Sequence, residues 1–560
     1  MKRIINISIL SVSLFLSSCG FLDVDPQVIC EDNFYKTEKD MLNGLAGVYG
    51  VMSNYGFYGN YYTFDCSSVD DLCYVNRPAS SVAEVTNLYK HSAGTQQIFE
   101  VWTEIYEGIK NANAFMNASE SVRSDSLDPE GKLCNEARFL RAYYHFILAQ
   151  AWGNIPVRTE EVTSLDAVSC PAMPQYEALS WSAEEMEACL QLADRTLDNA
   201  PSRVTANTIH GILSRVYLFM AGESVEGGDK KALYGKAMEH ADSVITSGLH
   251  RLNDDYSAVF KNMISDRYDT EFRESMWEVD FYGSRESADR WTNGRIGELN
   301  GLQNTSTTGF DQFMCNFSTA RYNASLKLWN LYWYLDREEQ DKGVSDEASK
   351  KFDARQEWNM PPYNYQATAG KSKSGYVYLG KNSLNDPLTA RAMRNTGKWR
   401  REVEYEGLIG KRELHTGINF PILRYSDVLL MYAEASLEYN EAVEQKAYDC
   451  VKAVRDRAGV LTNDISTYDV ASFREFVRNE RGRELCFEAT RKYDLIRWGI
   501  FVEEMNRYVD WTSDPEWMGQ SGLAGYAAEL GNAVEAKHIL LPIPLKELGT
   551  NKELKQNPMW

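Results

Sequence analysis

Apolar residues recur at steps of three and four over most of the chain, which is the spacing of helices with one buried face. A polar residue, Thr37, stands where the first of these helices begins, as expected of an N-cap. The periodic stretches cover residues 38–52, 98–115, 133–148, 183–197, 205–220, 234–247 and 429–436. The pattern therefore predicts a mostly α-helical protein.

The predicted helices form successive pairs with small residues at packing positions, such as Ala206, Gly211 and Ala237. These pairs are similar to tetratricopeptide-type units, although their spacing does not keep a strict 34-residue period. Helix pairs of this kind bury their apolar faces only when several of them stack on one another. We therefore expect one continuous body rather than separate domains. It would comprise a helical repeat part (about 37–250), a variable loop-rich part (about 251–419) and a C-terminal helical part (about 420–560).

Aromatic residues gather where the helical period is lost, at residues 55–89 and through much of 251–419. There they stand among Gly, Asn, Ser and Asp, which favours long loops carried by the helical body. Trp329 and Trp333 are an exception. They accompany leucines at near-helical spacing, which favours a place in the core.

The densest pattern lies at residues 479–499, NERGRELCFEATRKYDLIRWG. Apolar or small residues recur on one predicted helical face, and nine charged residues occupy the other positions. Single exposed pairs add only about 0.2–0.5 kcal/mol to a helix, so such density favours an ion-pair network between packed helices. The expected helical face is Gly482, Leu485, Ala489, Tyr493 and Ile496, and the expected pairs are Glu480–Arg483, Glu488–Lys492 and Asp494–Arg497.

Glu480 and Glu484 also allow a catalytic interpretation, because they lie one turn apart like the paired carboxylates of a glycosidase. A general acid needs a raised pKa, however, and each of these residues has an arginine within one turn to hold it ionised. The structural interpretation is therefore preferred, and no catalytic residue is assigned.

The N-terminus has the pattern of an export signal. Lys2 and Arg3 precede an apolar run from Ile4 to Leu16, which is too short for a membrane span. Small residues then lead to Cys19, as in lipoprotein signals, so residues 1–18 are expected to be removed and Cys19 to carry the lipid. An ordinary cleavage site with an incidental cysteine is the alternative.

The net charge of −21 argues against nucleic acid and anionic lipid as partners. Nine cysteines remain beside Cys19, and only Cys66 and Cys73 are close enough within a loop-like segment to suggest a disulfide. The seven histidines never fall at helical ligand spacing, and no nucleophile elbow or phosphate loop is present, so no metal or cofactor is expected.

Several blocks, taken in order, resemble the RagB/SusD family of surface glycan-binding lipoproteins of Bacteroidetes-type bacteria. They are Cys19 with the following GFLDVDPQ, residues 136–144 with the terminator WGNIP at 152–156, residues 418–427, residues 479–499, and LPIP at 541–544 with Asn557-Pro558. The resemblance runs from Cys19 to Trp560.

This resemblance implies a SusD-like helical scaffold with an irregular, loop-rich ligand region. It also implies a lipid anchor at the outer membrane, facing outward, and a SusC-like TonB-dependent transporter as partner. The implied activity is capture of an oligosaccharide or polysaccharide and its delivery to that transporter, without catalysis. The alternatives are a surface glycoside hydrolase and an adhesion or structural lipoprotein.

The ligand residues are predicted from chemistry, because a sugar packs its C–H face on an aromatic plane and needs polar partners for its hydroxyls. Two stretches offer both. One is Tyr74, Asn76 and Arg77 with Tyr58, Tyr61 and Asp65 nearby; the other runs from Tyr282 to Trp291, and Trp291 is the preferred single candidate. The alternative is that these rings are core residues beneath loops.

Overall fold

The computed structural model describes residues 34–78, 85–124, 127–162, 164, 166–196, 201–281, 294–304, 316–332, 353–367, 374–378, 388–404, 414–512 and 522–560. The predicted mostly helical fold is confirmed. The helices are α3 (Glu38–Gly50), α4 (Gln96–Val122), α5 (Lys132–Trp152), α6 (Gln175–Cys189), α7 (Ala206–Met220), α8 (Lys230–Ser247), α9 (Tyr256–Ile264), α11 (Ala354–Asn359), α12 (Leu388–Ala392), α13 (Tyr425–Asn440), α14 (Gln445–Arg457), α15 (Val470–Leu485), α16 (Arg491–Arg497), α17 (Phe501–Thr512), α19 (Leu523–Ala533) and α20 (Leu545–Thr550).

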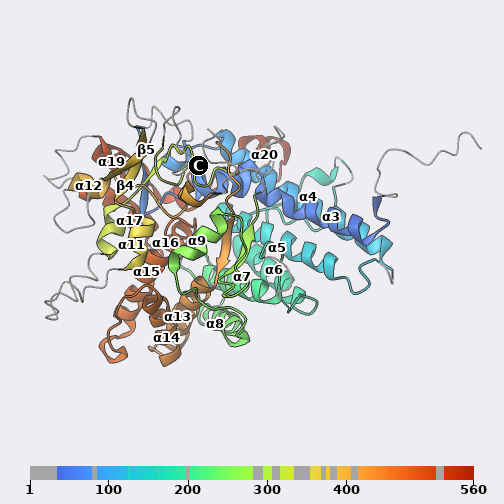
Figure 1. Cartoon of the computed structure of the whole chain (residues 1–560). Coiled ribbons are helices and arrows are strands. Elements are labelled where there is room, and N and C mark those ends of the chain that lie inside the picture. Colours follow the sequence, from blue (N-terminus) through green and yellow to red (C-terminus); the bar gives the residue numbers. More distant parts are fainter. Residues whose placement is uncertain are drawn as a thin grey trace, which may run out of the picture.

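Consecutive helices pack on one another from α4 through α8, and α8 then packs on α13. Helix α13 in turn contacts α14 and α15, so the N-terminal and C-terminal helices form one scaffold. Figure 1 shows this path from the blue and cyan helices α3 to α6, through the green α7 and α8, to the orange α13 to α15. A single cluster of buried apolar residues extends from Met41 to Leu554 along the chain.

Helix α3 illustrates how the sequence sets an element. The Thr37 side chain accepts a hydrogen bond from the Asp40 amide, and the Asp40 side chain accepts one from the Thr37 amide, which makes a capping box. Met41, Leu45 and Val48 lie on its buried face, as their spacing predicts. Helix α6 differs from the expectation of 183–197: it follows Pro174 and ends at Cys189, after which the chain turns.

Three small antiparallel sheets join distant parts of the chain. Strand β1 (Cys73–Val75) pairs with β3 (Tyr322–Ala324), with Tyr74 opposite Asn323. Strand β2 (Ser275–Val279) pairs with β6 (Phe420–Arg424), and β4 (Tyr363–Ala367) pairs with β5 (Ser374–Tyr378). The first sheet thus connects the aromatic-rich segment after α3 to the middle of the chain.

The charged stretch at 479–499 is two helices, α15 and α16, where one was expected. Helix α15 ends at Leu485, and Phe487 and Ala489 have positive φ values of 67° and 57°. These backbone angles leave the right-handed helical region and turn the chain before α16 begins. The apolar spacing continues across the turn, which is why it resembles a single helix in the sequence.

The expected ion-pair network is present and lies inside the protein. Glu480 contacts Arg483 at 2.9 Å and Arg355 at 2.7 Å, and all three side chains are buried. The predicted pair Asp494–Arg497 is also present at 2.9 Å. The pair Glu488–Lys492 is wrong: Glu488 binds Arg424 and Lys398, each at 2.7 Å, and the Lys492 ammonium donates to the Cys66 carbonyl oxygen. The turn after Leu485 separates these two side chains.

The structure also tests expectations about individual cysteine and tryptophan residues. Cys66 and Cys73 are free, buried thiols, so the suggested disulfide is wrong, and the Cys73 thiol donates to the Ser68 carbonyl oxygen. Trp329 is a core residue as predicted, and Trp333 lies outside the described residues.

Within the described part of the chain, no helix has the length and apolar character needed to cross a membrane. Cys19 and the segment before it lie outside the described residues.

Candidate functional site

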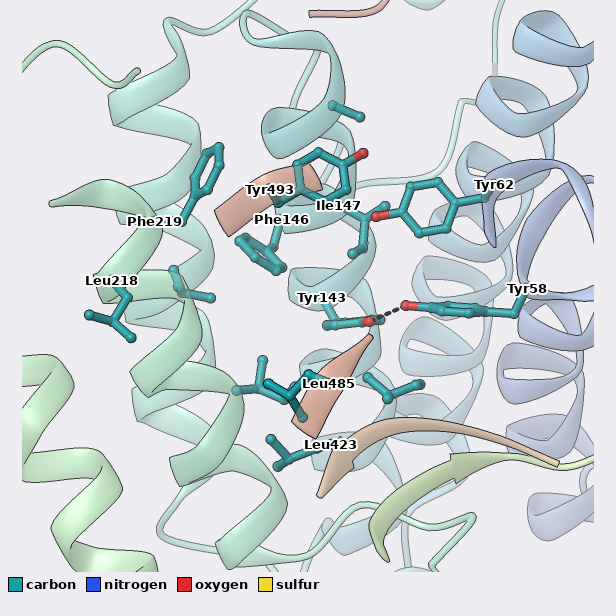
Figure 2. Close-up of a cluster of buried hydrophobic side chains, with 14 of the residues drawn as sticks. Tyr58, Tyr62, Tyr143, Phe146, Ile147, Leu218, Phe219, Leu423, Leu485 and Tyr493 are labelled. Atoms are coloured by element: carbon teal, nitrogen blue, oxygen red, sulfur yellow. Dashed lines mark hydrogen bonds between the residues drawn. The ribbon is translucent and has the colours of Figure 1, made fainter. Parts of the chain in front are cut away.

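The aromatic segment after α3 folds inward rather than forming the expected long loops. It makes two short π-helical turns, η2 (Tyr55–Gly59) and η3 (Tyr61–Cys66), that pack on α4. Figure 2 shows Tyr58 and Tyr62 pointing from these turns toward Tyr143 and Tyr493, with the hydroxyls of Tyr58 and Tyr143 hydrogen-bonded. Burial raises the pKa of Tyr58 well above its usual range. This ring is therefore part of the core packing.

Tyr74 and Asp65, two other predicted ligand residues, are buried as well. Tyr74 is 2% exposed, and its hydroxyl donates to the Ala392 carbonyl oxygen at 2.9 Å. Asp65 is also 2% exposed. Tyr58, Tyr74 and Asp65 are thus all buried, and a direct contact with ligand stays a prediction for each.

Tyr61, Asn76 and Arg77 are half-buried and reach the surface. The Asn76 amide donates to the Ala320 carbonyl oxygen at 2.8 Å and to the Asn323 side-chain oxygen at 2.9 Å. The Arg77 guanidinium donates to the Thr319 carbonyl oxygen at 2.5 Å. Strand pairing between β1 and β3 therefore continues into side-chain contacts that fix these two polar residues.

Arg295 extends this surface toward η2. Its backbone amide donates to the Gly59 carbonyl oxygen at 2.8 Å, and its guanidinium donates to the Tyr55 hydroxyl oxygen at 3.2 Å. The same guanidinium donates to the Glu298 carboxylate at 2.9 Å. Glu298 is 0% exposed and also accepts from the Thr319 hydroxyl at 2.6 Å. Arg295 is thus held in one orientation between an aromatic ring and a buried carboxylate.

Two aromatic contacts complete the arrangement. The Tyr55 and Tyr61 rings meet edge to face, with centroids 4.9 Å apart, and the His415 ring lies 6.3 Å from Tyr55. Tyr55, Tyr61, Arg295 and His415 are all half-buried. We name as the Tyr55–Arg295 patch the continuous set of Tyr55, Tyr61, Asn76, Arg77, Arg295, Glu298, Thr319 and His415.

A half-buried carboxyl group lies against η2 beside the patch. Glu104 of α4 lies against η2, where a Cβ added to Gly56 would sit 2.7 Å from its carboxylate. Burial raises the pKa of Glu104 to about 7, and the backbone amides of Gly56 and Phe57 oppose that shift. A side chain at position 56 would therefore displace the Glu104 carboxylate from η2.

The patch combines ring faces and edges with guanidinium donors and with the Asn76 side-chain oxygen as an acceptor, since both N–H groups of that amide are bonded within the protein. This combination suits a polyhydroxylated ligand, whose C–H groups pack on rings and whose hydroxyls bond to polar side chains. Its one described carboxylate, Glu298, is buried and neutralised by Arg295. Among the described residues, no cluster of three or more His, Cys, Asp or Glu side chains is arranged to hold a metal ion.

Sequence reasoning found part of this patch and missed the rest. Tyr61, Asn76 and Arg77 were predicted. The residues of the patch that were not predicted are Tyr55, Arg295, Glu298, Thr319 and His415. Arg295 meets Tyr55 from 240 residues away in the sequence, and His415 meets it from still farther along the chain. No local sequence pattern indicates such contacts. Tyr282 and Trp291 lie outside the described residues, shortly before Gly294 and Arg295 in the sequence.

The two carboxylates considered for catalysis are buried, and their surroundings keep them ionised. Glu480 and Glu484 are both 0% exposed. Burial favours the neutral form of Glu480, but Arg355, Arg455 and Arg483 outweigh it and lower the pKa to about 2. Charges of the surrounding arginines likewise hold the pKa of Glu484 well below its usual range despite burial. Neither group is suited to donate a proton at neutral pH.

Comparison with known families gives two matches that cover most of the chain. The model of the SusD family matches residues 273–560. A second model, described as starch-binding and associating with the outer membrane, matches residues 20–218. A SusD-like protein of Formosa agariphila is 24% identical over 554 residues, which cover 96% of this chain and 94% of that protein.

Solved structures share the fold. A SusD homolog from Bacteroides thetaiotaomicron superposes with a TM-score of 0.78 at 23% identity, covering 95% of this chain and 98% of that one. A laminarin-binding SusD-like protein superposes with a TM-score of 0.64 at 19% identity, covering 94% and 100%. A surface glycan-binding protein of Bacteroides fluxus gives 0.65 at 19% identity, also covering 94% and 100%.

Proposed function

The chain belongs to the SusD family, and on that premise we propose that it binds a neutral oligosaccharide or polysaccharide at the Tyr55–Arg295 patch. The observation that carries the proposal is the convergence of Tyr55, Tyr61 and Arg295 on one half-exposed surface, with the Arg295 guanidinium 3.2 Å from the Tyr55 hydroxyl. Rings held edge to face offer apolar contact, the fixed guanidinium offers donors to sugar hydroxyls, and the Asn76 side-chain oxygen offers an acceptor.

The relatives support a glycan as the ligand. One family model carries the description starch-binding, one structural neighbour is named laminarin-binding and another glycan-binding. We infer that Trp291 and Tyr282, which stand shortly before Arg295 in the sequence, add stacking surface to the patch.

The same proposal includes location and partner. Residues 1–18 act as a lipoprotein signal, and Cys19 carries the acyl chains that hold the body, residues 19–560, at the outer membrane facing outward. Acyl burial contributes about 0.8 kcal/mol per CH2, so several chains give stable anchoring. The captured glycan passes to a SusC-like TonB-dependent transporter. The family model described as associating with the outer membrane supports this location.

We propose binding without catalysis. Glu298 in the patch is neutralised by Arg295, and Glu480 and Glu484 are buried among arginines. A glycosidase would need a pair of carboxyls beside the ligand, one of them with a raised pKa. Glu104 has a pKa raised to about 7, but its carboxylate is turned to the Gly56 backbone, and Glu298 is paired with Arg295.

The test is native electrophoresis of the full chain in gels that contain starch, laminarin or another neutral polysaccharide. Retardation in at least one gel, without release of reducing sugar over the same period, is expected. Hydrolysis would favour the glycosidase, and absence of retardation in every gel would favour an adhesion or structural lipoprotein. Copurification of the full chain with a β-barrel transporter tests the partner.

A further inference from the structure

A second concave site lies between α4, residues 156–162 and α20, and it shares no residue with the Tyr55–Arg295 patch. The cleft encloses about 400 Å3, a size within the range of about 300–1,000 Å3 that small-molecule sites occupy. We name it the α4–α20 cleft. Residues that face into it include Tyr106, Ile109, Lys110, Arg158, Glu160 and Glu547.

Residues 156–162 form one wall of the cleft and are held to α4 by hydrogen bonds from side chains of that helix. The Tyr106 hydroxyl donates to the Pro156 carbonyl oxygen at 2.7 Å. The Asn113 amide donates to the carbonyl oxygens of Arg158 and Glu160 at 3.2 and 3.3 Å. The segment therefore lies in a fixed position along the helix, and the Tyr106 ring, with its hydroxyl already bonded, lines the cleft as a fixed platform.

Helix α5 holds the same segment from behind. The Arg141 guanidinium, itself paired with Glu185 at 2.8 Å, donates to the Thr159 carbonyl oxygen at 2.9 Å. The His145 ring accepts a hydrogen bond from the Arg158 amide at 3.0 Å. Successive backbone groups of the wall are thus occupied by buried side chains. The Arg158 guanidinium donates to the carbonyl oxygens of Ala167 and Val168, whereas Lys110 and Glu160 are exposed at the rim and can make other contacts.

The third wall, α20, is fastened to distant parts of the chain. The Leu545 amide donates to the Ala93 carbonyl oxygen at 2.9 Å. The Asn551 side chain accepts from the Cys170 amide at 3.2 Å and donates to the Cys170 carbonyl oxygen at 2.7 Å. The cleft is therefore formed in the folded chain and needs no closure to exist, which lowers the cost of ordering on binding.

The chemistry of the cleft is that of a site for a neutral, polyhydroxylated ligand. Tyr106 and Ile109 give an apolar floor, and the rim carries both signs of charge, with Lys110 and Arg158 near Glu160 and Glu547. Burial raises the pKa of Glu547, against the opposing charge of Arg158. The rim is not uniformly charged and therefore does not favour an anion or a cation. It offers both hydrogen-bond donors and acceptors, which are the partners that hydroxyl groups need.

We propose that the α4–α20 cleft is a second saccharide-binding site, which takes one or two units of the same polysaccharide that the Tyr55–Arg295 patch binds. This inference rests on the proposed function. Its consequence is bivalent attachment: a chain held at one site meets the other at high effective concentration, which raises the affinity for polymer over that for short fragments.

The test uses the full chain with exposed rim residues replaced, Lys110→Ala together with Glu160→Ala. The matched control is Lys39→Ala with Glu107→Ala, an exposed base and acid outside the cleft lining. Both pairs leave the net charge unchanged. Retardation is measured in starch and laminarin gels, and amide hydrogen exchange of residues 103–113 and 156–162 is measured with each polysaccharide.

The proposal expects the cleft variant to bind polymer about tenfold more weakly than the control. It also expects the polysaccharide to slow exchange in both segments, even when Tyr55→Ala and Tyr61→Ala have disabled the patch. If the cleft variant matches the control and neither segment is protected, while the patch variant loses retardation, the second site is refuted and the proposed function stands. No retardation of the natural chain in any gel refutes both.

Discussion

Arg491 of α16 and Asp71, two residues before β1, form a two-pronged ion pair across 420 positions of sequence. The arginine Nε lies 2.9 Å from one carboxylate oxygen, and its terminal nitrogen lies 2.8 Å from the other. Both side chains are buried, and Lys327 contacts the same carboxylate at 2.6 Å. The charged C-terminal segment thus fixes the base of the strand that continues into Asn76 and Arg77.

Replacement of Arg491 by Ala is expected to destabilise the protein by about 3–5 kcal/mol, because the Asp71 charge would stay buried with one partner fewer. Thermal unfolding followed by calorimetry measures this loss. Arg507→Ala is the matched control, since Arg507 is half exposed and pairs with Glu503 on the surface. Equal melting temperatures for the two variants would show that the buried pair does not stabilise the fold.

Acid is expected to unfold the protein through its buried carboxylates. Despite the opposing effect of burial, the neighbouring arginines lower the pKa values of Glu480 and Asp427 to about 2, from ordinary values of 4.5 and 3.8. A depressed pKa in the folded state stabilises above the unfolded value and loses that contribution as the pH falls. The free energy of unfolding should therefore decrease between about pH 4.5 and pH 2, as measured by urea titration at each pH.

Glu278 is expected to have the opposite effect at higher pH. Burial raises its pKa to about 7 from 4.5, with Ser275 and Asn419 opposing the shift and Asp280 adding to it. A raised pKa stabilises below the unfolded value and loses this contribution as the pH rises through 7. Stability should thus increase from about pH 8 to about pH 5, and Glu278→Gln should flatten that rise. An unchanged slope in the variant would assign the rise to other groups, such as Glu104.

Cys19→Ala is expected to release the protein from membranes while its melting temperature stays unchanged, because α3 begins well beyond Cys19 in the sequence. Fractionation of cells that express the full chain, followed by detection in membrane and soluble fractions, measures the release. A Cys30→Ala chain is the control, since Cys30 lies in the same N-terminal stretch. Tight membrane association of the Cys19→Ala chain would contradict the anchor.

Trp291→Ala is expected to weaken glycan binding by about tenfold or more, since loss of one aromatic platform costs about 1–3 kcal/mol. The melting temperature should change little, because polar residues and Gly surround Trp291 in the sequence. Isothermal calorimetry with the polysaccharide that retards the natural chain measures the affinity. Trp329→Ala, a core substitution, should instead lower the melting temperature. Unaltered affinity of the Trp291→Ala chain would remove this residue from the site.

The sequence predicted those parts of the fold that depend on local periodicity. The buried face of α3 and the pair Glu480–Arg483 follow from spacing alone. The turn between α15 and α16 was missed because the apolar period continues across Phe487, where only the backbone angle reveals the break.

The candidate site was predicted only in part, because ring burial and long-range pairing leave no local signal. Tyr58 and Tyr61 lie in the same aperiodic stretch. The Tyr58 hydroxyl is hydrogen-bonded to the Tyr143 hydroxyl inside the core, whereas the Tyr61 ring packs against Tyr55 in the patch. Arg295 reaches the aromatic part of the patch through its contacts with Gly59 and Tyr55. Such contacts between distant segments are set by the complete fold.

The affinity of a Tyr55→Ala, Tyr61→Ala chain for polysaccharide tests the central claim most directly. The natural chain and the variant are compared by calorimetry with the polysaccharide that retards the natural chain, after circular dichroism confirms that the variant is folded. Loss of the two rings is predicted to weaken binding by about tenfold or more. An affinity equal to that of the natural chain would contradict the placement of the glycan site at the Tyr55–Arg295 patch.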